Sequence, residues 1–154
     1  MSMAPILPRN EAVLRGRFPL VHHRLTLAGD RTSGDCFYKK TEKGPKLFIR
    51  RGEHEFPAYG EKNPDKLIER WLSSLVLAPD SLYGISGFGD GSHLIKFLDD
   101  TPVGTNVFAA EKDPGLLRET LSLIDVSSLL ANERFFLGAG EPDDGARAAA
   151  RVRP

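Results

Sequence analysis

The chain has 154 residues, of which 40% are hydrophobic and 27% are charged, a composition typical of one soluble globular domain. Its 21 basic and 21 acidic residues leave no net charge, so no overall field draws it to nucleic acid or to an anionic membrane. The single cysteine, Cys36, excludes an internal disulfide and a cysteine-rich metal site. No apolar run approaches the roughly 20 residues of a membrane helix, and no signal-peptide pattern is present, so we expect a cytoplasmic protein.

Residues 1–34 are expected to form an irregular N-terminal segment. Pro5, Pro8 and Pro19 argue against one continuous helix here, because proline lacks an N–H donor and clashes with the preceding turn. Residues 21–27 alternate loosely between apolar and polar side chains, so we predict a strand there.

A β-hairpin is predicted at residues 36–50. Two short runs rich in aromatic and aliphatic residues, 36–39 and 46–50, flank a polar turn. We interpret the outward basic side chains of this hairpin as a solvated face, and a polyanion-binding surface is the alternative. Residues 52–62 are polar and contain a proline and a glycine, so we expect a connector there.

Asn63 and Pro64 predict the start of a helix, because asparagine is a favourable N-cap and proline is tolerated at the first helical position. The apolar residues that follow recur at helical spacing and form one face, and Pro79 ends the pattern. These residues are Leu67, Ile68, Trp71, Leu72, Leu75 and Val76. Trp71 lies at the centre of this face, so we expect it to pack in the core.

The run at residues 81–91 carries the main functional signal. A short, partly apolar strand ends in three glycines at alternate positions. They are Gly87, Gly89 and Gly91. A helix is predicted from Ser92, and a second strand at residues 106–110 ends on Glu111. A strand, a glycine-rich turn, a helix and a strand with an acid at its tip form the opening unit of a nucleotide-binding α/β sheet.

The remaining elements complete a small α/β domain. A helix capped by Asp113 precedes a further helical turn or two at residues 125–131 and a third parallel strand at residues 133–138. The predicted fold is a small Rossmann-like parallel sheet with an N-terminal β-hairpin, covering residues 35–145. Residues 146–154 form a tail rich in alanine and arginine.

The glycine turn is the predicted cofactor site, because N–H groups at a helix N-terminus have no partner inside the helix and the helix dipole is positive there. Glu111, 20 residues after Gly91, occupies the place where such folds bind ribose hydroxyls, and a surface acid is the alternative. Asp90 would oppose a pyrophosphate but not the amino group or hydroxyls of S-adenosylmethionine. The candidate cofactors are S-adenosylmethionine and a nucleotide.

Phe88, His93 and Asp113 are further candidates for cofactor contacts. His93 would face ligand or solvent with its pKa lowered by the helix N-terminus, and ordinary packing is the alternative. Asp113 acts first as a helix cap. We predict no metal site, since His22 and His23 point to opposite faces of a strand. We also predict no catalytic residue, because no serine or cysteine has the sequence context of an activated nucleophile.

Three motifs follow one another across residues 46–140. They are Gly87-Phe-Gly-Asp-Gly-Ser-His-Leu, Phe108-Ala-Ala-Glu-Lys-Asp-Pro and Leu129-Leu-Ala-Asn-Glu-Arg-Phe-Phe-Leu-Gly-Ala-Gly. In this order they resemble the N-terminal Rossmann-like domain of the motility accessory factors, bacterial proteins whose central domain is associated with transferring nonulosonic acids to flagellin. A related central domain occurs in archaeal 6-hydroxymethylpterin diphosphokinases. The resemblance implies the fold and the position of a ligand cleft.

The resemblance does not extend to catalysis. The transferase chemistry implied for that family belongs to a domain that follows this one, and Ser92 stands where the family often has a tyrosine. The sequence therefore favours a non-catalytic accessory domain for recognition or assembly, with a downstream transferase domain or a second copy as partner and no membrane or nucleic acid. The alternative is an S-adenosylmethionine-dependent methyltransferase, or a degenerate cofactor-binding relative, although such enzymes usually carry a larger sheet.

Overall fold

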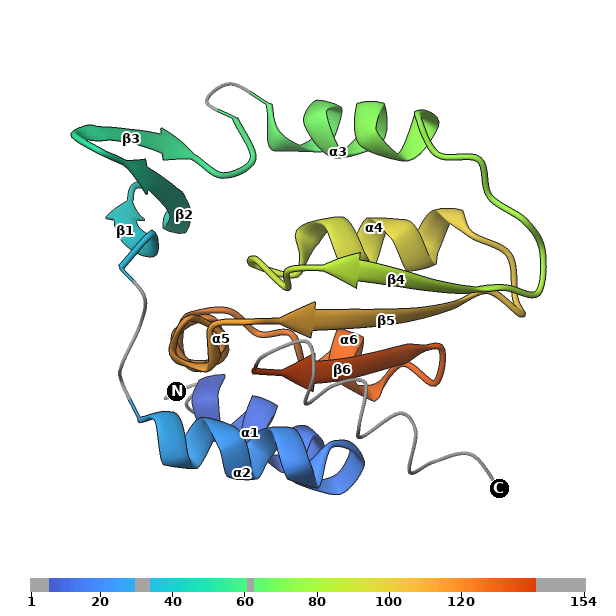
Figure 1. Ribbon diagram of the computed structural model, residues 1–154, viewed down its shortest axis with the longest axis horizontal. Coiled ribbons are helices and arrows are strands. Elements are labelled where there is room, and N and C mark those ends of the chain that lie inside the picture. Colours follow the sequence, from blue (N-terminus) through green and yellow to red (C-terminus); the bar gives the residue numbers. More distant parts are fainter. Residues whose placement is uncertain (1–5, 30–33, 61–62, 141–154) are drawn as a thin grey trace.

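The computed structural model describes residues 6–29, 34–60 and 63–140 and shows a mixed α/β protein with two separate sheets (Figure 1). A parallel sheet has the strand order β4-β5-β6, and an antiparallel sheet has the order β1-β2-β3. The strands are β1 Cys36–Thr41, β2 Gly44–Arg51, β3 His54–Pro57, β4 Leu82–Ser86, β5 Asn106–Glu111 and β6 Phe135–Ala139. The predicted α/β class and the predicted order of a hairpin followed by three parallel strands are confirmed.

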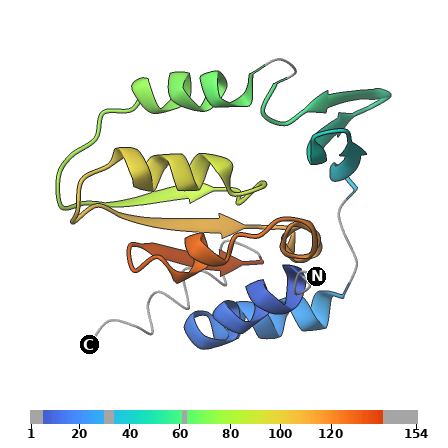
Figure 2. The ribbon, with the colours of Figure 1, turned by 180° about the vertical axis from the view of Figure 1, so that it is seen from behind.

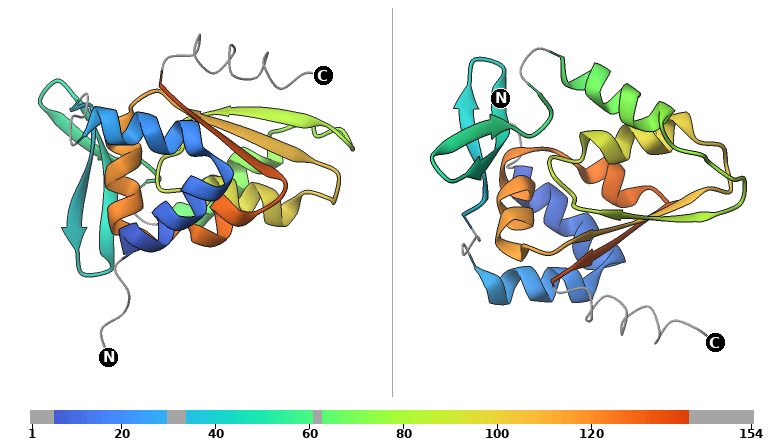
Figure 3. Two further views of the ribbon diagram at one scale, coloured as in Figure 1. Left: turned by 90° about the horizontal axis from the view of Figure 1, so that it is seen from below. Right: turned by 45° about the horizontal axis from the view of Figure 1, so that its top comes forward.

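Helices connect the parallel strands on one side of the sheet. α4 (Ser92–Asp100) joins β4 to β5, and α5 (Pro114–Leu123) and α6 (Ser127–Ala131) join β5 to β6. Because the strands lie in chain order, right-handed crossovers place α4 and α6 on the same face, as Figure 3 shows. The core between this face and the helices is apolar and fully buried at Phe88, Leu94, Phe97, Val107, Leu130 and Phe135.

The described part of the N-terminal segment is helical, so both the irregular segment and the strand predicted at residues 21–27 are wrong. The two helices are α1, Ile6–Arg17, and α2, Pro19–Ala28. Pro8 lies in the first turn of α1 and Pro19 opens α2, where the missing N–H has no helical partner to lose. Val21 and Leu25 are buried one turn apart, which the loose alternation concealed.

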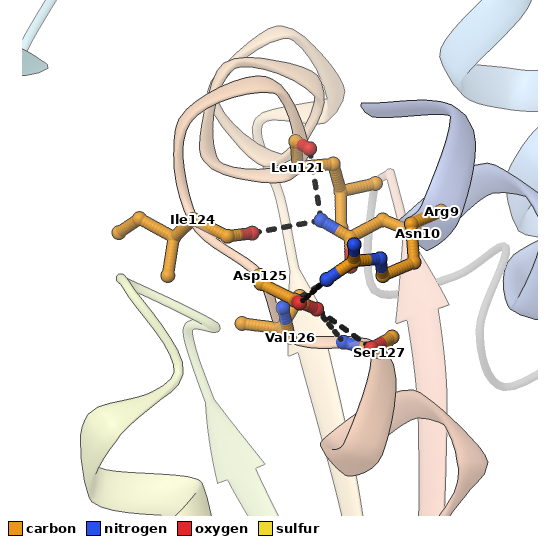
Figure 4. Close-up of polar contacts among 7 residues, drawn as sticks. All are labelled: Arg9, Asn10, Leu121, Ile124, Asp125, Val126 and Ser127. Atoms are coloured by element: carbon orange, nitrogen blue, oxygen red, sulfur yellow. Dashed lines mark hydrogen bonds and ion pairs between the residues drawn. The ribbon is translucent and has the colours of Figure 1, made fainter. Parts of the chain in front are cut away.

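A buried asparagine fixes α1 to the segment that links α5 and α6 (Figure 4). The side-chain amide of Asn10 donates to the carbonyl oxygens of Leu121 (2.9 Å) and Ile124 (2.7 Å). Its oxygen accepts the N–H of Val126 at 3.1 Å. Beside it, Arg9 forms an ion pair with Asp125. These contacts satisfy buried backbone groups that no helix ladder could reach.

The predicted hairpin is confirmed, but it continues into a third strand. β3 lies inside the segment predicted as an irregular connector, which is therefore wrong over residues 54–57. β3 pairs antiparallel with β2, with Arg50 opposite Glu55, and these two side chains form an ion pair at 3.2 Å. Its four residues do not alternate between apolar and polar side chains, so its composition does not predict a strand. The strand is defined by its pairing with β2.

The helix predicted after Asn63 forms as α3, Pro64–Ser73. The Asn63 side chain accepts the N–H of Lys66 at 3.2 Å, which confirms the predicted cap. α3 ends earlier than Pro79, and Val76 is 97% exposed, so the apolar face is shorter than predicted. The predicted tail, residues 146–154, lies outside the described residues. Among the helices within the described ranges, none combines the length and the hydrophobicity needed to cross a membrane.

Candidate ligand-binding site

A cavity of about 450 Å³ lies at the carboxyl ends of β4 and β5, and residues of the antiparallel sheet and of α3 also line it. Figure 2 shows the antiparallel sheet and α3 on the same side of the parallel sheet. Its apolar wall is formed by Leu47, Ile49, Ala58, Leu67, Ile68, Trp71 and Leu116. Its polar wall is formed by Cys36, Tyr59, Ser86, Gly87, Gly89, His93, Glu111 and Lys112. Pockets of about 300–1,000 Å³ with an apolar lining and a few polar groups are typical of small-molecule sites, and the carboxyl edge of a parallel sheet is their usual position.

The three glycines of the turn are required by its backbone. Gly87, Gly89 and Gly91 have φ angles of +93°, +57° and +86°, in the left-handed region that side chains disfavour. Gly89 also lacks room, because a Cβ there would lie 2.2 Å from the hydroxyl oxygen of Tyr59. The alternate spacing therefore reflects backbone conformation and close packing, whatever the turn binds.

The protein itself occupies several N–H groups of the glycine turn. The Phe88 N–H donates to a Glu111 oxygen at 3.0 Å, and the Asp90 N–H donates to the Tyr59 hydroxyl at 3.3 Å. The Ser92 N–H donates to the Asp90 carboxylate at 2.8 Å, so Asp90 acts as a cap inside the turn. A pyrophosphate would have to compete for these donors, and Asp90 adds a negative charge beside them.

Glu111 is a buried acid, only 6% exposed, and so the alternative of a surface acid is wrong. One carboxylate oxygen accepts the N–H of Phe88, and the other accepts the N–H of Asp113 at 3.1 Å. Glu111 thereby ties the glycine turn to the end of β5, and it still lines the cavity. Because a carboxylate has about four lone-pair sites, two remain for hydroxyl or amino groups of a ligand.

His93 lies under the antiparallel sheet, with both ring nitrogens engaged. Nδ1 lies 2.8 Å from the Tyr59 hydroxyl, and Nε2 lies 3.2 Å from the carbonyl oxygen of Gly87. The carbonyl can only accept, so Nε2 carries the proton and Nδ1 accepts from Tyr59. Burial lowers the pKa of His93. The direction agrees with the sequence-based expectation, but the cause is burial, whereas the sequence pointed to the helix N-terminus.

Two tyrosines that the sequence analysis did not single out attach the antiparallel sheet to the glycine turn. Tyr59 follows β3 and reaches Asp90 and His93. Tyr38, on β1, places its hydroxyl 2.8 Å from that of Thr120 and 3.4 Å from the Gly89 carbonyl oxygen. Burial raises the pKa of both phenols, so both are neutral donors. The inward alternation of Cys36 and Tyr38 in the predicted hairpin was the available signal for one of them.

Three further candidates, Phe88, Gly91 and Asp113, do not line the cavity. The Phe88 ring is fully buried and packs edge-on against Phe135, so it belongs to the core and its proposed cofactor contact is corrected. Asp113 caps α5 by accepting the Leu116 N–H at 3.2 Å, as predicted. Gly91 packs near Val126, where a Cβ would lie 3.2 Å from its methyl carbon. The structure thus brings Gly87, Gly89, His93 and Glu111 together around one cavity.

Burial and hydrogen bonds within the protein restrict several polar side chains of the cavity. Burial and the negative charge of Glu111 raise the pKa of the Cys36 thiol, which keeps it protonated and a poor nucleophile. His93 uses both nitrogens in structural hydrogen bonds. Lys112 and the remaining hydrogen-bonding capacity of Glu111 place one positive and one negative group in the polar wall, opposite the apolar wall.

Comparisons of the chain with protein-family models, with curated proteins and with solved structures found no match.

Proposed function

We propose that this protein is a non-catalytic, Rossmann-like recognition domain that binds a small molecule at the carboxyl edge of its parallel sheet. The observation that carries the proposal is the cavity of about 450 Å³ in which Glu111, His93 and the glycine turn meet the apolar wall around Trp71. An apolar wall opposite a few fixed polar groups suits a ligand with one flat or aliphatic part and one hydroxyl- or amino-bearing part.

The absence of turnover is supported by the state of the polar groups. General acid–base catalysis needs a side chain that can exchange a proton with the ligand at working pH. The Tyr59 and Tyr38 phenols have raised pKa values, the Cys36 thiol is protonated, and His93 is held by two partners. The resemblance to the motility accessory factors supports the same reading, with a transferase domain or a second copy as the partner in assembly.

A second candidate is a cofactor-binding relative of the S-adenosylmethionine-dependent methyltransferases. The observation that favours it is the position of Glu111, which ends β5 and lines the cavity with hydrogen-bonding capacity to spare. Its partners Phe88 and Asp113 orient the carboxylate, as a ribose-binding acid would require.

Trp71 provides the test, because it is the only tryptophan of the chain and lines the cavity. We would titrate the protein with S-adenosylmethionine and with nucleotide sugars, following tryptophan fluorescence and heat. Saturable binding that Glu111→Gln weakens at least about tenfold, a loss of about 1.4 kcal/mol, would support a site at this cavity. Neither methyl transfer nor sugar transfer is expected.

The control is Glu133→Gln, which removes an acid that lies outside the cavity. Binding of S-adenosylmethionine alone, with methyl transfer to an added substrate, would replace the accessory-domain proposal by the second candidate. Binding that is unchanged in Glu111→Gln and in His93→Gln would place the ligand elsewhere and contradict both.

A further inference from the structure

β4 is an edge strand of the parallel sheet, and its free side faces a second cavity. Within the described chain β4 pairs only with β5. A cavity of about 410 Å³ follows the free edge, between the strand and α3. Its walls are Trp71 from α3, Leu75 from the segment that follows α3, residues 83–86 of β4, and His93 and Phe97 from α4. The cavity is therefore a groove between a strand edge and a helix.

The free edge presents backbone groups that need partners. The Asn106 N–H donates to the Ser81 carbonyl oxygen at 2.9 Å, and the Gly87 N–H donates to the Ala110 carbonyl oxygen at 2.7 Å. Residues 81 and 87 thus face β5, and alternate residues of a strand point to opposite sides. Leu82, Gly84 and Ser86 consequently direct their N–H and C=O groups to the free edge, where the described residues supply no hydrogen-bond partner. Of these three residues, Gly84 and Ser86 also line the groove.

Nothing in β4 protects this edge against pairing. Natural sheets guard free edges with lysine, proline, bulges or a covering element, and the sequence Leu82-Tyr-Gly-Ile-Ser86 contains no charge and no proline. The groove is lined by uncharged side chains, and burial lowers the pKa of His93, which favours its neutral form. Charge complementarity therefore selects an uncharged, apolar occupant.

The position of α3 indicates whether the groove can bind a folded partner surface or a single extended segment. α3 lies on the β4 side of the parallel sheet, as Figures 1 and 3 show. Trp71 of α3 and Leu75, just after this helix, line the groove together with β4. A second copy would have to bring a whole sheet edge past these side chains, whereas the groove has a volume of only about 410 Å³. One extended segment needs only the usual spacing of about 4.8 Å from β4 and would lie against these side chains.

We infer that the free edge of β4 binds an extended, uncharged peptide segment of a partner protein as an added strand. Leu82, Gly84 and Ser86 supply the main-chain hydrogen bonds. Alternate side chains of the segment pack against Trp71, Leu75 and Phe97, so the partner carries apolar residues at every second position. This site differs from the ligand cavity proposed above and adjoins it, because Trp71, Ser86 and His93 border both.

The test uses a random dodecapeptide library displayed on phage, selected against the full chain, with affinities of the selected synthetic peptides measured by fluorescence polarisation. We expect enriched peptides to alternate apolar with small or polar residues and to carry little charge. Gly84→Pro removes an N–H that points away from β5, and a Cβ at this position meets nothing within 4 Å. It should therefore lower affinity at least about tenfold while the β4–β5 pairing stays intact.

A second variant keeps the test decisive if proline disturbs the sheet. Leu75→Arg places a charge in the wall of the groove and should abolish peptide binding, whereas Val76→Arg, at the exposed neighbour, should leave it unchanged. Failure to enrich any peptide, or peptides that bind Gly84→Pro and Leu75→Arg as well as the unaltered chain, would overturn the inference. So would a dimer in sedimentation equilibrium that Gly84→Pro dissociates, since the occupant would then be a second copy.

Discussion

The hydroxyl of Tyr59 lies 2.8 Å from Nδ1 of His93 and thereby joins the antiparallel sheet to the first turn of α4. The same hydroxyl accepts the Asp90 N–H at 3.3 Å, and the two rings lie 5.8 Å apart between centroids. One side chain thus closes the cavity and holds the glycine turn. The sheet β1-β2-β3 is positioned over the cavity by this contact and by Tyr38.

Removing the Tyr59 hydroxyl tests how much it contributes to the free energy of unfolding. Tyr59→Phe leaves the Asp90 N–H and Nδ1 of His93 without their partner, so the free energy of unfolding should fall by about 1–2 kcal/mol. Urea denaturation followed by circular dichroism measures the change. The control is Tyr83→Phe, whose hydroxyl bonds only the exposed loop at Ala78 and should cost less, about 0.5 kcal/mol. Equal effects for the two variants would contradict the proposed tie.

The glycine turn predicts a contrast between two glycine-to-alanine variants. Gly89→Ala combines a positive φ with a Cβ 2.2 Å from the Tyr59 oxygen, so we expect a loss of roughly 2–3 kcal/mol. Gly16→Ala lies in α1 with no atom near its Cβ and should stabilise the protein by about 0.5–1 kcal/mol. Thermal denaturation separates the two, and a stable Gly89→Ala protein would mean that the turn adopts another conformation.

The helix caps illustrate which elements of the fold could be predicted from the sequence. Asn63 and Asp113 predict the starts of α3 and α5, because an N-cap is a local interaction. The cap side chain accepts a hydrogen bond from the N–H three residues further along the chain. The strands β4, β5 and β6 were recognisable because they are apolar and bounded by glycine or polar residues. β3 was not recognisable, because only its pairing with the neighbouring strand β2 defines it. The helices α1 and α2 were not, because they pack against elements more than 80 residues further along the chain, such as α5.

The same division applies to the site. Gly87, Gly89 and Glu111 lie in a local pattern of known geometry, and all three line the cavity. Tyr59 lies in a segment with no pattern of its own, and its role arises only when β2 and β3 have paired. Phe88 was misassigned because a residue between two glycines can point either to the ligand side or to the core.

Asn10 should be among the most sensitive polar positions in the chain. Asn10→Ala leaves two carbonyl groups and one N–H without partners in a fully buried place, so we expect a loss of roughly 2–4 kcal/mol. Asn63→Ala removes an exposed cap and should cost about 1 kcal/mol. Guanidinium denaturation of both variants checks the difference, and a cost for Asn10→Ala no larger than that for Asn63→Ala would contradict it.

His93 makes stability depend on pH near neutrality. Burial lowers its pKa from the ordinary value of 6.5, so the unfolded chain takes up the proton first. Its contribution is fully present above about pH 7 and is lost as the pH falls from 6.5 through the lowered pKa. Unfolding measured between pH 8 and pH 5, with NMR titration of the ring, tests this. His93→Gln should flatten the slope, and His54→Gln, at an exposed position, is the control variant.

Asp125 governs a second pH window. The hydroxyl and N–H of Ser127, together with Arg9, lower the pKa of Asp125 from 3.8 to about 2. The stabilisation is present above about pH 4 and is lost as the pH falls towards 2, because the unfolded carboxylate protonates first. Asp125→Asn should reduce the stability difference between pH 5 and pH 2.5, and an unchanged difference would show that other carboxylates control acid unfolding.

The attachment of α1 has a consequence for the order in which the protein can fold during synthesis. The partners of Asn10 lie 111 to 116 positions further along the chain, so α1 leaves the ribosome long before the groups it binds exist. Until residues 121–126 emerge, Asn10 on the buried face of α1 lacks its hydrogen-bond partners. Closing a loop of more than 100 residues between them is slow. Docking of α1 is therefore a late event, and a nascent chain halted before residue 121 would expose that helix to proteases and chaperones.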